Sequence, residues 1–247
     1  MIEVEKYSKL YGDTVAVREL SFTVQQGEVL GLVGPNGAGK TTTLRALAGI
    51  LQPTSGIIRI DGIDLHEDPV SAKSRLAFIP DEPQLFDYLT VTEHLGFMAR
   101  LYGVPDAEPR IRVLLEELEL TNKKESLPTE LSRGMRQKLA IACGLLHRPA
   151  ALLLDEPLTG LDPVGIRRMK ETIAARAREG ASVILSSHLL HLVQELCTRL
   201  LVIRRGEMVA FGSMNEIIAS RPALAGKSLE EMFIELTRDD TAEPVAA

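Results

Sequence analysis

The amino-acid sequence predicts an α/β fold, with a largely parallel sheet, an N-terminal antiparallel β subdomain and an inserted α-helical subdomain. Apolar residues at 29–33 lead through a glycine-rich stretch into a helical pattern, which is the strand, loop and helix order of such folds. A second apolar stretch, at 151–154, ends in two carboxylates. Between them, from about 90 to 146, the pattern is mostly helical, so this part is predicted to be inserted between strands.

The N-terminal part is typical of short strands joined by turns. Residues 2–24 contain alternating apolar and polar side chains around a turn at 11–13. After the first helix, the sequence at 53–56 is typical of a turn and that at 57–60 of a strand. A further strand is expected at 76–80, where it ends in proline.

Helical periodicity marks the middle of the chain, and an α/β alternation follows it. Ile111, Leu114, Leu115 and Leu118 are spaced to form one helical stripe. Beyond residue 150 we expect strands at 151–154, 182–186, 200–203 and 208–211, and helices at 164–178, 189–197 and 229–236. The predicted organisation is one domain at 1–237, its helical subdomain at about 85–147, and a flexible tail at 238–247.

The composition argues against several classes of protein. A net charge of −6 over 247 residues disfavours a basic surface for nucleic acid. The two cysteines, Cys143 and Cys197, lie far apart in apolar helical stretches, so buried thiols are expected and not a disulfide or metal site. No apolar run approaches the roughly 18 residues of a membrane helix, and the N-terminus lacks a signal-peptide pattern. We expect a soluble, cytoplasmic protein.

The stretch GPNGAGKT, at 34–41, has the spacing of a phosphate-binding loop. Its glycines allow positive φ angles and close approach to phosphate, while backbone N–H groups and the helix N-terminus attract the anion. Lys40 can reach the β- and γ-phosphates, and the Thr41 hydroxyl can bind Mg²⁺. The alternative is an ordinary glycine-rich turn, which the flanking strand and helix disfavour. The expected nucleotide-binding residues are Gly34, Pro35, Asn36, Gly37, Ala38, Gly39, Lys40, Thr41 and Thr42.

Asp155 and Glu156 follow an apolar strand directly. Ligands of open α/β sheets lie beyond the carboxyl ends of such strands, so both carboxylates are candidates for the nucleotide site. Asp155 is placed to hold Mg²⁺, and Glu156 to orient and deprotonate an attacking water. Glu156 is therefore a candidate catalytic residue, together with Lys40. The alternative is that both acids only terminate the strand in solvent.

Ser132 begins the helix that follows Leu131 and is a natural N-cap residue. Its hydroxyl and the free N–H groups of the first helical turn form a possible second anion site. The residues alone favour the alternative, a capped helix without any ligand.

Taken in order, these motifs resemble those of the ATP-binding cassette (ABC) ATPases. The likeness rests on the phosphate loop, a loop near residue 81, the LSRGM helix start at 131–135, LLLDE at 152–156, and a strand ending in Ser187-His188. It covers at least residues 1–215. It implies a phosphate-loop NTPase core of the RecA-like type that hydrolyses MgATP.

The resemblance also implies roles for individual residues. Ser132 and Gly134 would contact the γ-phosphate bound by a second cassette. Tyr11 would stack on adenine, and Asp162 would belong to a loop that signals between subunits. His188 would be the catalytic switch histidine at the γ-phosphate. Without the resemblance, Tyr11 is typical of a turn and His188 of a strand end.

The sequence departs from the family pattern at two motifs. The usual LSGGQ signature reads LSRGM here, with Arg133 and Met135 as the substituted residues. The loop glutamine that touches Mg²⁺ in the family is matched by Asp81 in FIPDEP, and a carboxylate can also bind Mg²⁺. Both substitutions, together with the LEEMFIELT ending, resemble the bacterial exporter ATPases whose membrane subunits are separate chains.

We therefore expect the ATP-hydrolysing subunit of an exporter, which pairs with a second cassette and drives a separate integral membrane permease from the cytoplasmic face of the membrane. The second cassette is either another copy of this chain or a different chain, and the intact site motifs favour a homodimer. Its cofactors would be ATP and Mg²⁺. A soluble cassette ATPase acting on ribosomes or DNA is the first alternative, which the acidic charge disfavours. A phosphate-loop kinase or regulatory switch is the second, and neither LSRGM nor His188 is needed for it.

Overall fold

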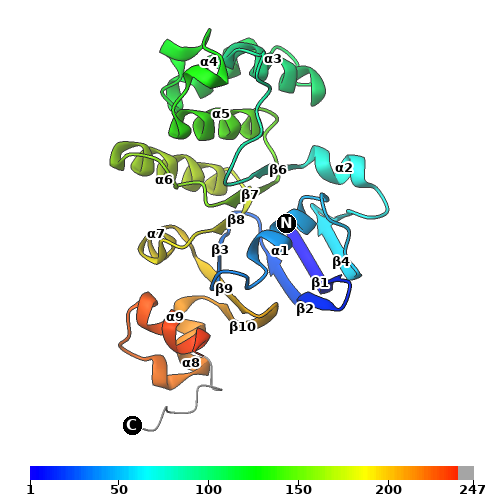
Figure 1. Cartoon of the computed structure of the whole chain (residues 1–247), viewed down its shortest axis with the longest axis vertical. Coiled ribbons are helices and arrows are strands. Elements are labelled where there is room, and N and C mark those ends of the chain that lie inside the picture. Colours follow the sequence, from blue (N-terminus) through cyan, green and yellow to red (C-terminus); the bar gives the residue numbers. More distant parts are fainter. Residues whose placement is uncertain (239–247) are drawn as a thin grey trace.

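In the computed structural model, which describes residues 1–238, the chain folds around two β-sheets (Figure 1). The first is antiparallel with strand order β2-β1-β4-β5. Its strands are β1 (Ile2–Tyr11), β2 (Thr14–Val24), β4 (Ser55–Ile60) and β5 (Ile63–Asp64). The predicted turn at 53–56 was wrong in its second half, because Ser55 pairs with Ser8 of β1 and so begins β4 two residues earlier than expected.

The second sheet is parallel except at one edge, with strand order β10-β9-β3-β8-β7-β6. Its strands are β3 (Val29–Val33), β6 (Leu76–Ile79), β7 (Ala151–Asp155), β8 (Ser182–Ser186), β9 (Arg199–Arg204) and β10 (Glu207–Gly212). All residues of β3, β7 and β8 are buried, because both faces of the sheet are covered.

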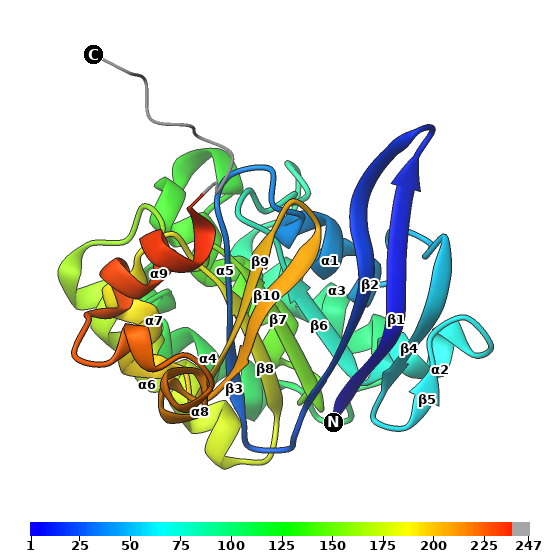
Figure 2. The same ribbon diagram turned by 90° about the horizontal axis from the view of Figure 1, so that it is seen from below.

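Alternate side chains of the parallel strands enter two different cores. Ala151 and Leu153 of β7 face a core that includes helix α1 (Lys40–Leu47) and the antiparallel sheet. Leu152 and Leu154 face the opposite core, which contains α6 (Pro163–Arg178). This two-residue period is the geometry of a strand, and it places α1 between the two sheets (Figure 2).

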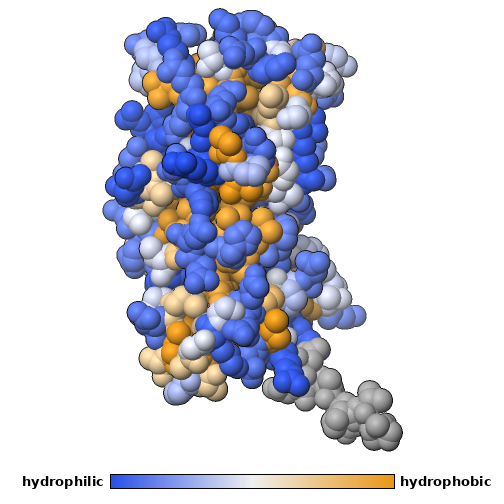
Figure 3. Space-filling view, turned by 90° about the vertical axis from the view of Figure 1, so that its left-hand side faces the viewer, coloured by the Kyte–Doolittle hydropathy of each residue, from blue (hydrophilic) through white to orange (hydrophobic). Residues whose placement is uncertain are grey.

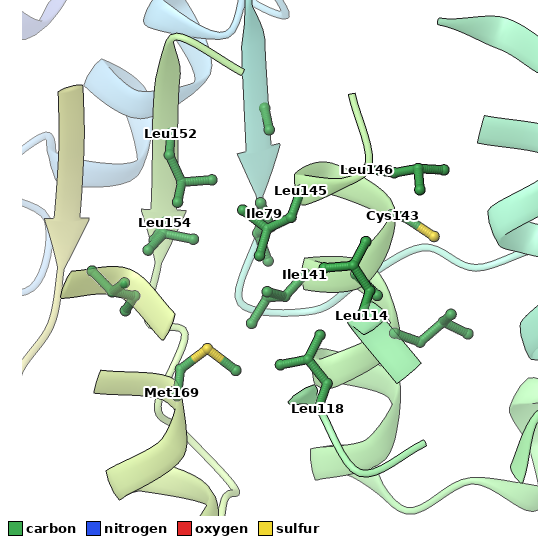
Figure 4. Packing of buried hydrophobic residues seen from close by; sticks show 14 of the residues in the cluster. Ile79, Leu114, Leu118, Ile141, Cys143, Leu145, Leu146, Leu152, Leu154 and Met169 are labelled. Atoms are coloured by element: carbon green, nitrogen blue, oxygen red, sulfur yellow. The ribbon is translucent and has the colours of Figure 1, made fainter. Parts of the chain in front are cut away.

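Three helices occupy the chain between β6 and β7 and lie together at one end of the molecule (Figure 1). They are α3 (Val91–Leu101), α4 (Glu108–Glu117) and α5 (Arg133–Leu145), with short 3₁₀ turns at Thr121–Lys123 and Pro128–Glu130. Figure 4 shows how Leu114 and Leu118 meet Ile141 of α5 and Met169 of α6. The predicted stripe of Ile111, Leu114, Leu115 and Leu118 is buried, and it joins these helices to the sheet.

The C-terminal part packs on the other end of the sheet. Its helices are α7 (Leu190–Leu196), α8 (Met214–Ser220) and α9 (Leu229–Thr237), with a 3₁₀ turn at Pro222–Leu224. The remaining helix, α2 (Pro69–Ser74), lies between β5 and β6 in the chain. Met232 and Leu236 of α9 share a small core with Val202 of β9. Polar side chains cover most of the face in Figure 3, and apolar ones form separate patches. Within residues 1–238, no helix has both the length and the apolar character needed to cross a membrane.

The predicted α/β architecture is confirmed: a core built on a largely parallel sheet carries an antiparallel N-terminal sheet and an inserted helical segment. Both cysteines are free, with Cys143 buried and Cys197 partly buried. The division into a domain at 1–237 and a helical subdomain at about 85–147 stays a prediction. Residues 239–247 of the predicted flexible tail lie outside the described part of the chain.

Candidate nucleotide site

The glycine-rich loop connects the end of β3 to the start of α1. Gly39 has a φ of +104° at the N-cap of α1, a conformation that other residues rarely adopt. Gly34 is required for a different reason: a Cβ atom there would lie 2.3 Å from the carbonyl oxygen of Ile203 on β9. The loop is therefore folded tightly against the end of the neighbouring strand, with the N-terminus of α1 beneath it.

Lys40 lies within the curve of this loop. Its Nζ atom donates hydrogen bonds to the carbonyl oxygens of Gly34, at 2.7 Å, and Pro35, at 3.2 Å. Burial lowers the pKa of the Lys40 ammonium, while the carboxylates of Glu156 and Asp155 act in the opposite direction. The cation and both carboxylates thus share one site, as the sequence predicts.

A cavity of about 400 Å³ opens beside the loop and gathers residues from several distant segments. Its lining residues are Ala16, Asn36, Gly37, Gly39, Lys40, Thr41, Thr42, Asp81, Asp155, Glu156, Thr159 and His188. Ten of these were predicted from the sequence. Ala16 on β2 and Thr159 after β7 were missed, because small or neutral residues outside a motif carry no signal of their own.

Asp155 ends β7 and is 5% exposed. One of its carboxylate oxygens accepts a hydrogen bond from the Ser186 hydroxyl at 2.5 Å. The partner comes from the next strand of the sheet, because Asp155 and Ser186 are in register. This bond satisfies part of a buried carboxylate and fixes its orientation toward the cavity. Ser186 belongs to no motif, so nothing in the sequence marks it as a site residue.

Glu156 adopts a left-handed backbone conformation, with a φ of +50°. This conformation is uncommon for residues other than glycine, and such residues cluster at functional sites. The Glu156 side chain is 17% exposed, and its Oε2 atom lies 2.8 Å from Nδ1 of His188. The backbone N–H of His188 donates to the same oxygen at 3.3 Å. Two of the three predicted catalytic side chains, Glu156 and His188, therefore contact each other.

The donor set fits a nucleotide with Mg²⁺. Thr41, Asp81 and Asp155 all line the cavity, and hydroxyl and carboxylate oxygens are the ligands that Mg²⁺ takes in proteins. Residues 1–238 contain no cluster of three His, Cys, Asp or Glu side chains able to hold a metal ion by themselves. A Mg²⁺ ion here would need further oxygen ligands, and Mg²⁺ usually takes these from water and substrate phosphates.

Several predicted residues lie outside this cavity. Ser132 caps α5, where its hydroxyl oxygen accepts a hydrogen bond from the Met135 N–H at 3.2 Å. Asp162 caps α6 in the same way. Tyr11, at the tip of the β1–β2 hairpin, is 49% exposed and has the Lys9 ammonium 5.1 Å from its ring centre. The residues outside the cavity lining are Tyr11, Gly34, Pro35, Ala38, Ser132, Gly134 and Asp162.

Comparisons with known proteins agree on one family. A family model described as ABC transporter matches residues 17–159. The Nod factor export ATP-binding protein I of Paraburkholderia xenovorans is 39% identical over 221 residues, which cover 89% of this chain and 73% of the relative.

Two solved structures share the fold. One, described as an ATP binding subunit of an ABC transporter, has a TM-score of 0.91 and 34% identity, and the match covers 96% of this chain and 99% of the other. The second is a dimeric ATP-binding cassette in a post-hydrolysis state, bound to ADP and Pi. It has a TM-score of 0.78 and 23% identity, with 87% of this chain and 99% of the other covered.

Proposed function

This chain belongs to the ABC transporter family as an ATP-binding subunit with ATP hydrolase activity, and we propose that it drives export through a separate membrane protein. The ATP hydrolase activity is supported by one cavity that joins the phosphate loop to Asp155, Glu156 and His188. The name of the Nod factor export relative supports the direction of transport.

In the proposed reaction, water attacks the γ-phosphorus of bound ATP, the bond to the β–γ bridging oxygen breaks, and ADP and inorganic phosphate are the products. The loop N–H groups and Lys40 bind the phosphates, and Thr41, Asp81 and Asp155, which line the cavity, would hold Mg²⁺. Glu156 takes the proton of the attacking water.

His188 holds the Glu156 carboxylate in place, since its ring nitrogen and its backbone N–H both contact Oε2. A base fixed in this way loses little freedom when it accepts the proton.

We propose that two cassettes assemble to complete each site. Ser132 and Gly134 lie outside the cavity of their own chain, although the N-terminus of α5 is suited to bind an anion. In a head-to-tail dimer, this helix start would face the nucleotide held by the partner, and Asp162 would lie near the contact between the two chains. The dimeric cassette structure supports this arrangement. Tyr11 is proposed to contact adenine from the tip of its hairpin.

An apolar groove supports the proposed membrane partner. The groove, of about 240 Å³, lies between the loop at 83–86, α3 and α5, and it includes Phe86 and Phe97. Phe86 is 54% exposed and Phe97 is 39% exposed, and their ring centres lie 5.3 Å apart, so two neighbouring aromatic side chains are partly open to solvent. The groove lies next to Asp81, so an apolar segment of a membrane subunit docked there would be close to the nucleotide site. The chain would then be associated with the cytoplasmic face of the membrane.

Purification in mild detergent from the native membranes tests this proposal. We expect a polytopic membrane protein to co-purify at near-equal stoichiometry and to be identified by mass spectrometry. Phe86→Ser should weaken this association, whereas Val70→Ser, which removes an apolar side chain that is 79% exposed on α2, should not. Recovery with ribosomal or DNA-repair proteins, and with no membrane protein, would instead favour the soluble cassette ATPase.

A further inference from the structure

Two of the three residues at which this sequence departs from the family motifs, Arg133 and Asp81, contact each other. The Arg133 guanidinium lies 3.1 Å from Oδ1 of Asp81, and both side chains are about half exposed, at 50% and 43%. The two residues are 52 positions apart, and Arg133 stands at the first turn of α5 while Asp81 lines the nucleotide cavity. Within residues 1–238, the other oxygen of Asp81 makes no hydrogen bond.

The surroundings of Arg133 hold its side chain in this direction. Arg133 and Gln137 lie one helical turn apart on the same face of α5, and the Gln137 amide approaches the carbonyl oxygen of Pro80 at 3.5 Å. On the other side, the Arg133 stem packs against Gly160, where an added Cβ would lie 3.1 Å from the Arg133 Cδ. The N-terminus of α5 therefore contacts the loop at 80–81 on one side and the loop at 159–162 on the other.

The charges of Asp81 and Arg133 affect how the site binds Mg²⁺ and phosphate. A neutral glutamine near a bound metal adds no charge, whereas an aspartate adds one negative charge that attracts Mg²⁺ and repels the phosphates. The guanidinium cancels that charge within one ion pair. We infer that Arg133 is a positioning residue for the nucleotide site: it holds Asp81 at the cavity and makes the pair electroneutral, so that Asp81 and Arg133 together take the place of the neutral loop residue.

This inference rests on the proposed function, and it predicts opposite effects for the two single substitutions. The readout is a ratio for a non-hydrolysable ATP analogue: its dissociation constant without metal, divided by its dissociation constant with excess Mg²⁺. Arg133→Gln leaves Asp81 unpaired, which repels free ATP more than MgATP, so the ratio should rise. Asp81→Asn leaves Arg133 unpaired, so the ratio should fall. Each change should be about three- to tenfold, and Asp81→Asn/Arg133→Gln should return to within about twofold of the parent.

The experiment uses the full chain at concentrations low enough to keep it monomeric, because a role of Arg133 in a dimer would then not contribute. Arg168→Gln is the matched control: Arg168 pairs with Glu119 at 3.2 Å and is 45% exposed, yet it does not line the cavity. Shifts of the same sign in both single variants, or a double variant as far from the parent as either single one, would overturn the inference. Loss of Mg²⁺ dependence in the parent chain would contradict the proposed function instead.

Discussion

Replacing Glu156 with glutamine tests the chemistry of the site directly. Glutamine has the same shape and can still accept a hydrogen bond from the His188 N–H, which contacts Glu156 at 3.3 Å. It cannot take a proton from water. Because the side chain is largely enclosed, at 17% exposure, no bulk carboxylate or buffer base can easily replace it. Turnover should therefore fall while the site keeps its structure.

The expected loss follows from the role of a positioned base. General-base catalysis contributes about 10²- to 10⁴-fold in rate, which corresponds to about 3 to 5 kcal/mol of transition-state stabilisation. The affinity for ATP, in contrast, should not fall. Glu156 contributes a negative charge close enough to Lys40 to affect its pKa, so its removal relieves repulsion of the phosphates. ATP affinity should be equal to that of the parent or tighter by less than about tenfold.

Phosphate release at saturating MgATP measures turnover, and fluorescence of an ATP analogue measures affinity. Light scattering should detect an ATP-bound dimer that accumulates because hydrolysis no longer separates the cassettes. Glu171→Gln is the matched control, since Glu171 lies on α6, is 64% exposed and pairs only with Arg167 among the described residues. If Glu156→Gln hydrolyses ATP within threefold of the parental rate, Glu156 is not the base and this reasoning is refuted.

Three further predictions concern packing, the loop and a buried thiol. Leu118→Ala should lower the free energy of unfolding by about 2 to 5 kcal/mol in urea denaturation, whereas Val113→Ala, 58% exposed on α4, whose C-cap residue is Leu118, should change it by less than about 0.5 kcal/mol. Gly34→Ala should weaken ATP binding by more than about tenfold in calorimetry, because its methyl group would lie 2.3 Å from the Ile203 carbonyl oxygen; unchanged affinity would contradict the tight loop packing. Burial raises the pKa of the Cys143 thiol to about 12, so mass spectrometry should find it unalkylated at pH 8 in the folded protein and alkylated after unfolding. The unfolded thiol loses its proton first as the pH rises, so this residue should make the free energy of unfolding fall between about pH 9 and 12.

Much of the fold was accessible from the sequence because its signals are local. The strand at 29–33, the glycine-rich loop and the helix after it follow one another in the chain, so spacing alone predicts their order. Helical periodicity predicts that Leu114 and Leu118 are buried. The unbroken apolar run at 151–154 predicts a strand that is buried on both faces. The boundary at Ser55 was mispredicted because a strand extends as far as its partner does, and the partner lies in β1.

The sequence by itself determined the types of chemistry present: a phosphate loop, a strand ending in two carboxylates, and the order of motifs that identifies the family. Only the tertiary structure decided which of these groups meet. Sheet order sets β3 beside β8 and β8 beside β7, and this brings Lys40, Asp155 and His188 to one edge, with Ser186 beside Asp155. The contact between Asp81 and Arg133 likewise depends on where α5 packs. Contacts between residues far apart in the chain depend on packing that no single segment specifies.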